Sequence, residues 1–119
     1  TFYRQLLRMA RTEKAITHGE MYDLTYAQGE GFNKHEHYAY IRKYKQHTLL
    51  VVLNFDDHLT DIQVRIPQEA FAHLLQPEYS MVEATDLLTD TTYTFPFSPH
   101  TPVCLTLPAW KGVVLKIKG

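Results

Sequence analysis

The chain has 119 residues, of which 45% are hydrophobic and 13% aromatic, and its formal net charge at pH 7 is −1. This composition excludes intrinsic disorder and predicts one globular, β-rich domain with a core of its own. The 12 basic and 13 acidic residues form no long run of either sign, so we expect no nucleic-acid partner. No stretch approaches the ~20 apolar residues of a membrane-spanning helix, so we expect no membrane partner either.

The beginning of the chain has the pattern of an amphipathic helix over residues 2–14. Phe2, Leu6 and Met9 recur at helical spacing and form an apolar stripe. The segment has no capping residue at its start, and the first residue is not an initiator methionine. We therefore expect this segment to come from a longer protein, and we expect the helix to stop near His18.

The clearest local prediction is a hairpin of two strands over residues 37–55. Its first strand alternates, with tyrosines and an arginine on one face and Ala39 and Ile41 on the other. Its second strand is apolar on both faces: Leu49, Val51, Leu53 and Phe55 point one way, and Leu50 and Val52 point the other. Such a strand needs cover on both sides. A chain of this length has material for one covering layer, so we expect a neighbouring domain to provide the second.

Further strands follow the same alternating pattern, separated by turns. They are predicted at residues 20–26, 62–66, 81–88, 92–97, 103–107 and 112–118, with turns at 56–58 and 89–91. In the last of them, Val113, Leu115 and Ile117 are the inward candidates. Pro67 opens a short helical segment in which Phe71, Leu74 and Leu75 share a face. The fold class predicted is mainly β: an antiparallel β-sandwich of about seven or eight strands with an N-terminal helix.

Two short strings have residue types that are used in catalysis or metal binding. Asp56-Asp57 directly follows a strand, where aspartates commonly accept hydrogen bonds from nearby backbone N–H groups, so we favour a turn over a catalytic pair. In His35-Glu36-His37 the two imidazoles would share one side of a strand, but the sequence offers no third and fourth ligand nearby. We expect a polar loop that enters a strand, and we predict no metal and no cofactor.

The only cysteine, Cys104, lies in an apolar run, and this context predicts a buried, inert thiol. A single cysteine excludes an internal disulfide, and it leaves both a cytoplasmic and a periplasmic location open.

The aromatic side chains have two interpretations. Tyr38, Tyr40 and Tyr44 lie on one strand face, and Trp110 lies in a turn near the end of the chain. Exposed rings of this kind could stack on sugars, but aromatic residues are also frequent in strands because they pack well there. We favour packing for the tyrosine row, and we keep a glucan-binding surface as the alternative, with Trp110 as the first residue to test.

The order of these segments resembles the end of enzymes of the α-amylase superfamily, glycoside hydrolase family 13. The residues that resemble this family are Arg4-Gln5-Leu6-Leu7-Arg8, Ile16-Thr17-His18-Gly19-Glu20, Tyr38-Ala39-Tyr40-Ile41-Arg42, Leu50-Val51-Val52-Leu53-Asn54-Phe55, Asp86-Leu87-Leu88-Thr89 and Val113-Val114-Leu115-Lys116-Ile117. The resemblance implies that residues 1–18 are the last helix of a catalytic (β/α)₈ barrel and that residues 19–119 are the C-terminal β-sandwich.

The same resemblance implies a parent enzyme that hydrolyses α-linked glucans with retention. Its catalytic carboxyl groups would lie at the ends of barrel strands, outside this chain, so we predict no catalytic residue here. The expected function is that of a non-catalytic accessory domain that stabilises the barrel of the same parent chain. Two alternatives stay open: a carbohydrate-binding module for starch-like glucans, and an unrelated interaction domain that adds strands to a partner.

Overall fold

The computed structural model describes residues 20–29, 31–33, 35–45 and 47–118. These ranges contain eight strands, one short α-helix and one 3-10 turn. In chain order they are β1 (Glu20–Asp23), η1 (Thr25–Ala27), β2 (His37–Tyr44), β3 (His47–Asn54), β4 (Thr60–Val64), α3 (Gln68–Leu74), β5 (Tyr79–Asp86), β6 (Thr92–Phe97), β7 (Val103–Leu107) and β8 (Gly112–Lys118). The helix predicted over residues 2–14 and the domain boundary predicted after residue 18 lie outside the described residues.

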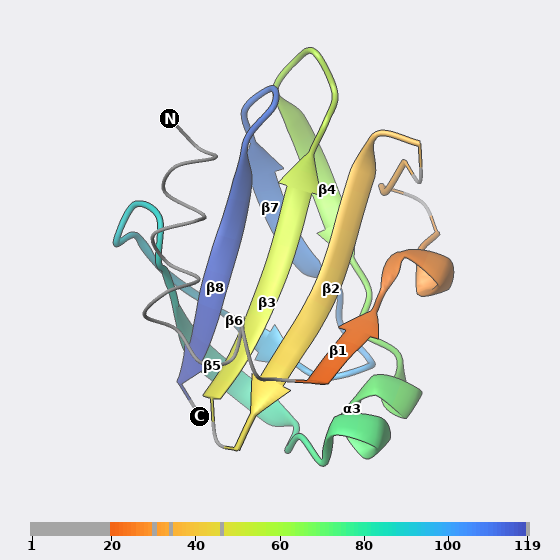
Figure 1. The fold of residues 1–119 in the computed structure, drawn as a ribbon, viewed down its shortest axis with the longest axis vertical. Coiled ribbons are helices and arrows are strands. Elements are labelled where there is room, and N and C mark those ends of the chain that lie inside the picture. Colours follow the sequence, from red (N-terminus) through yellow and green to blue (C-terminus); the bar gives the residue numbers. More distant parts are fainter. Residues whose placement is uncertain (1–19, 30, 34, 46, 119) are drawn as a thin grey trace.

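The strands form two antiparallel sheets that pack face to face. One sheet has six strands in the order β1-β2-β3-β8-β5-β6, and the other pairs β4 with β7. Figure 1 shows the broad face of the larger sheet, with β4 and β7 behind it and α3 at its lower end. The predicted antiparallel sandwich is therefore confirmed for the described residues.

The main core fills the space between the two sheets. Leu50 and Val52 of β3 point into it, and so do Val113, Leu115 and Ile117 of β8, as the alternation predicted. The smaller sheet contributes Ile62, Val64, Val103, Leu105 and Leu107 to the same cluster. Burial of apolar surface at about 25 cal/mol per Å² makes this layer the main stabilising contact of the fold.

Helix α3 closes one end of this core. Phe71 and Leu74 are buried, and the ring of Phe71 meets that of Phe97 edge to face, with centroids 5.1 Å apart. The prediction that Leu75 shares this buried face is wrong, because Leu75 is 85% exposed. It ends the helix in the left-handed conformation, with φ 53° and ψ 41°, which turns its side chain away from the helical stripe.

The outer face of the central strand is already buried in this chain. Leu49 and Val51 of β3 and Val114 of β8 are at most 1% exposed. Five partly buried side chains pack against them: Tyr40, Tyr44, Leu53, Leu87 and Leu88. These neighbours lie in the same sheet or directly after one of its strands, so they surround the cluster within the sheet. The prediction of a strand with two apolar, buried faces is confirmed, and cover of the outer face by a neighbouring domain stays a prediction.

Two other predictions are corrected. Cys104 is exposed, because β7 belongs to a two-stranded sheet with only one face toward the core, and Val103 and Leu105 occupy that face. The strand predicted over residues 20–26 ends at Asp23, whose Oδ1 accepts a hydrogen bond from Thr25 N (2.9 Å) and starts a turn. No helix in the described part of the chain is long and apolar enough to cross a membrane.

Candidate functional site

Two turns meet at one end of the larger sheet. One turn follows β3 (residues 54–58), and the other joins β7 to β8 (residues 108–111). We call this end of the sheet the two-turn end. Asn54 N donates to Lys111 O (2.8 Å), and Trp110 N donates to Asp56 O (3.3 Å). These backbone bonds hold the two turns side by side, although they are more than fifty residues apart in the sequence.

The buried side chain of Asn54 joins the same two turns. Its Nδ2 donates to the carbonyl oxygens of Leu107 and Pro108 (both 3.1 Å) and, more weakly, of His58 (3.3 Å). Its Oδ1 accepts from Asp56 N (2.9 Å). The amide is only 1% exposed, so these bonds fix the turns in an environment where an unpaired carbonyl would be costly.

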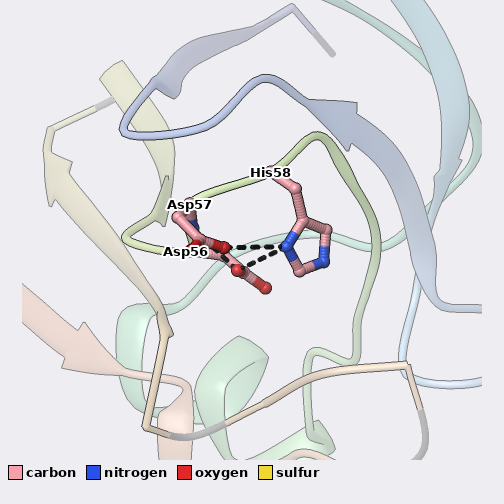
Figure 2. Close-up of side chains that lie close together, drawn as sticks. All are labelled: Asp56, Asp57 and His58. Carbon is pink, nitrogen blue, oxygen red and sulfur yellow. Dashed lines mark hydrogen bonds and ion pairs between the residues drawn. The ribbon is translucent and has the colours of Figure 1, made fainter.

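Asp56, Asp57 and His58 bring two carboxylates and an imidazole together, as Figure 2 shows. His58 Nδ1 lies 2.8 Å from Asp56 Oδ1 and 3.0 Å from Asp57 Oδ1. Asp57 N donates to Asp56 Oδ1 (2.7 Å), so the predicted turn role of this pair is confirmed. The sequence interpretation missed His58, which directly follows the two aspartates and completes the cluster.

The charges of this cluster shift its pKa values. The hydrogen bond with Asp57, followed by the charge of Asp56, raises the pKa of His58 above its ordinary value. The Asp56 carboxyl raises the pKa of Glu36 by a hydrogen bond between the two groups. Burial opposes ionisation of Asp56, but the hydrogen bonds with Glu36 and with the Asp57 backbone outweigh it and lower the pKa of Asp56.

The two histidines of His35-Glu36-His37 lie in different environments. His35 is exposed, whereas His37 is buried, and its Nδ1 accepts from Asn33 N (2.9 Å). The potential ligand atoms of Asp56, Asp57 and His58 instead lie within 4.8 Å of one another. These are types of group that bind metal ions, but the same contacts make a complete imidazolium–carboxylate ion pair, so the cluster needs no metal to explain it.

Trp110 is presented to solvent from the other turn. It is 62% exposed and adopts φ 57°, in the left-handed region. A left-handed conformation costs roughly 1–2 kcal/mol for a residue other than glycine, and a large exposed apolar ring adds little stability. An exposed residue held in a strained conformation is therefore a candidate for binding.

The structure does not gather the four aromatic residues singled out from the sequence. Tyr38 lies opposite Leu53, at the two-turn end, but Tyr44 lies opposite His47, at the far end of the same strand pair. At ~3.3 Å per residue these tyrosines are about 20 Å apart along β2. Tyr40 and Tyr44 also pack against the buried outer face of β3, so the expected packing role of the row is confirmed for these two.

The fold is that of a segment of α-amylase structures. A maltogenic α-amylase of Thermotoga neapolitana matches 96% of this chain over 24% of its own length, with a TM-score of 0.68 and 13% identity. An α-amylase of Geobacillus thermoleovorans, solved with acarbose, matches 93% of this chain over 21% of its own, with a TM-score of 0.65 and 14% identity. A trehalulose synthase mutant matches 98% over 17%, with a TM-score of 0.60 and 24% identity.

The chain thus spans about a fifth of the enzymes whose fold it shares. In sequence it matches no protein-family model and no curated protein at a significant level.

Proposed function

We propose that this chain is a non-catalytic accessory domain of an α-glucan-hydrolysing enzyme of the α-amylase type, and that it stabilises the catalytic barrel of the same parent chain. One observation supports this most strongly: nearly the whole chain matches these enzymes, whereas it covers only 17–24% of their lengths. A unit of this size has room for a sandwich but not for a (β/α)₈ barrel as well. The parent would hydrolyse its substrate with retention, through carboxyl groups outside this chain.

The stabilising role requires a surface that the domain can bury against the barrel. Apolar side chains that are exposed in the described part of the chain are available for this contact. Met21 and Tyr26, which lie on and just after the edge strand β1, are 44% and 56% exposed. Each 100 Å² of apolar surface buried in such a contact contributes about 2.5 kcal/mol.

A direct test of the non-catalytic assignment is to incubate the purified chain with soluble starch and to measure reducing sugar. We expect no release above buffer at enzyme concentrations and times that give complete digestion by an α-amylase. Starch hydrolysis that co-purifies with the folded chain and is lost in the Asp56→Asn variant would refute the assignment.

A second function is favoured by Trp110: the domain holds α-glucan on its surface. Trp110 combines a highly exposed ring with a backbone in the left-handed region. Retention of the chain on granular starch tests this function. We expect wild type to be retained and Trp110→Ala to elute, whereas elution of both forms would exclude glucan binding.

A further inference from the structure

We propose that the cavity next to the Trp110 turn receives a glucosyl unit of an α-glucan, while Trp110 stacks on a neighbouring unit of the same chain. This inference rests on the glucan-binding function proposed above, and it assigns that function a site. The cavity has a volume of about 420 Å³, within the range of ~300–1,000 Å³ that is usual for small-molecule sites.

The cavity lies between two hairpins. One wall comes from β5, β6 and the turn between them, and the other comes from β7, β8 and the Trp110 turn. Pro108 and Lys111, on either side of Trp110 in the sequence, both line it. Because β5 pairs with both β6 and β8, the two walls belong to one hydrogen-bonded framework, which makes the site preformed.

Both apolar and polar groups line this cavity. Leu88, Pro108 and the ring of Tyr93 provide apolar surface of the kind that packs against the C–H faces of a pyranose. The buried carboxylate of Asp86 is already used: it accepts from Leu88 N (3.1 Å), from Val114 N (3.3 Å) and from the Thr89 hydroxyl (2.9 Å). Asp86 therefore shapes the wall and holds the β5–β6 turn rather than waiting for a ligand.

Two polar groups of the lining remain available. Within the described part of the chain, the Tyr93 hydroxyl and the Lys111 ammonium have no hydrogen-bond or ion-pair partner. Burial, together with the charge of Asp86, raises the pKa of Tyr93, so its hydroxyl stays protonated and can both donate and accept. Lys111 can only donate, and sugar hydroxyls and ring oxygens accept such bonds.

The charge of the lining favours a neutral ligand. Asp86 and Lys111 are the charged residues that line the cavity, and they are of opposite sign. A phosphate or a carboxylate would meet the buried carboxylate of Asp86, and a cation would meet the ammonium of Lys111. A neutral ligand rich in hydroxyl groups avoids both costs and uses the free donors, which describes an uncharged glucan.

The backbone of the turn that carries Trp110 is held in place next to two residues that line the cavity, Pro108 and Lys111. The backbone N–H of Trp110 donates to Asp56 O, and Lys111 N donates to Pro108 O (3.3 Å) across the turn. Gly112 then starts β8 in close contact with Val52 and Leu53, where a side chain has no room. A turn whose backbone is fixed before binding loses little conformational freedom when the ring that it carries stacks on a sugar.

The test is titration of the purified chain with maltotriose and with a longer maltodextrin, followed by calorimetry and by NMR shifts. We expect Trp110→Ala to weaken binding at least tenfold, and we expect Tyr93→Phe and Lys111→Met each to weaken it about fivefold, because each removes one hydrogen-bonding group. The controls are Tyr26→Ala, an exposed aromatic elsewhere, and His58→Gln, in the turn after β3, which does not line the cavity. Both should bind within a factor of two of wild type.

The outcomes distinguish a wrong assignment of the cavity from a failure of the proposed glucan-binding function. If wild type binds and the Tyr93 and Lys111 variants bind equally well, the cavity assignment is overturned while glucan binding stands. If His58→Gln weakens binding and the cavity variants do not, the glucan extends over the Asp56–His58 turn instead, which also overturns the assignment. If wild type shows no shifts with either sugar, the second proposed function fails and this inference fails with it. Because Lys111 is exposed, we expect Lys111→Met to fold. This variant therefore still tests the cavity if Tyr93→Phe does not fold.

Discussion

Gly112 is the position at which one methyl group should be most damaging. It pairs with Leu53 at the start of the β3–β8 ladder. A Cβ built on it would lie 2.5 Å from Leu53 Cδ2 and 2.7 Å from Val52 O. The leucine methyl can rotate away, but the carbonyl belongs to the central strand, so β8 must move instead. We therefore predict that Gly112→Ala separates the first residue pair of this ladder.

The size of the effect follows from two losses and one smaller gain. Overpacking in a well-packed region costs ~1–3 kcal/mol, and a weakened ladder hydrogen bond costs about 1 kcal/mol. Alanine also lowers the conformational entropy of the unfolded chain, which raises the unfolding free energy by roughly 0.4–1 kcal/mol. The net loss should be about 2–3 kcal/mol, which at this chain length lowers the unfolding midpoint by roughly 10 °C.

Urea unfolding followed by far-UV circular dichroism measures this loss, and Gly29→Ala is the matched control. A Cβ at Gly29 would meet only Arg65 side-chain atoms, at 3.6 and 3.8 Å, which is ordinary contact. We expect the control to be neutral or slightly stabilising. Equal stabilities of the Gly112 and Gly29 variants would show that β8 does not approach β3 as described.

Three further predictions concern single side chains. Leu75→Gly should raise the unfolding free energy by about 0.5 kcal/mol, since it removes left-handed strain from an 85% exposed leucine; a loss in urea unfolding would refute this. Asn54→Ala should cost about 2–3 kcal/mol by the same assay, because it leaves buried carbonyls unpaired, and a loss below about 1 kcal/mol (roughly one ordinary hydrogen bond) would contradict the anchoring role. The raised pKa of His58 means that its stabilising contribution is fully present below its unfolded pKa of about 6.5 and is lost as the pH rises through its folded value. In NMR titrations, Asp57→Asn should lower the pKa of His58, and an unchanged value would exclude their hydrogen bond as the cause.

Strands with regular alternation between clear turns could be predicted from the sequence. The predicted bounds 92–97, 103–107 and 112–118 agree with β6, β7 and β8. The hairpin of β2 and β3 was also predicted, because its partners are adjacent in the chain and its turn is short. In each of these elements the local pattern and the tertiary packing require the same arrangement.

Long-range pairing could not be predicted in the same way. Nothing in the residues of β3 indicates that its second neighbour is β8, about sixty residues later. This pairing decides that Leu49 and Val51 lie beside Val114 in a buried cluster. The prediction that Cys104 is buried was wrong for the same reason. An apolar run does not reveal that its strand belongs to a two-stranded sheet.

The candidate site was only partly accessible from the sequence. Trp110 could be singled out because a tryptophan in a turn is conspicuous, but its left-handed backbone and the cavity next to it depend on how two hairpins meet. Tyr93 and Lys111 have no distinctive sequence pattern, and only the structure places them on one lining. The sequence pattern likewise grouped Tyr44 with Tyr38 because the two share a strand face. They lie near opposite ends of β2.

The central claim, that the domain stabilises a catalytic barrel, is tested most directly by the thermal unfolding midpoint of the longer enzyme that the proposal requires. The enzyme should be compared with a variant that lacks residues 20–118. Burial of even 200 Å² of apolar surface corresponds to about 5 kcal/mol, so the midpoint of the barrel should fall by several degrees in the shortened form. A barrel that unfolds at the same temperature without the domain would contradict the account.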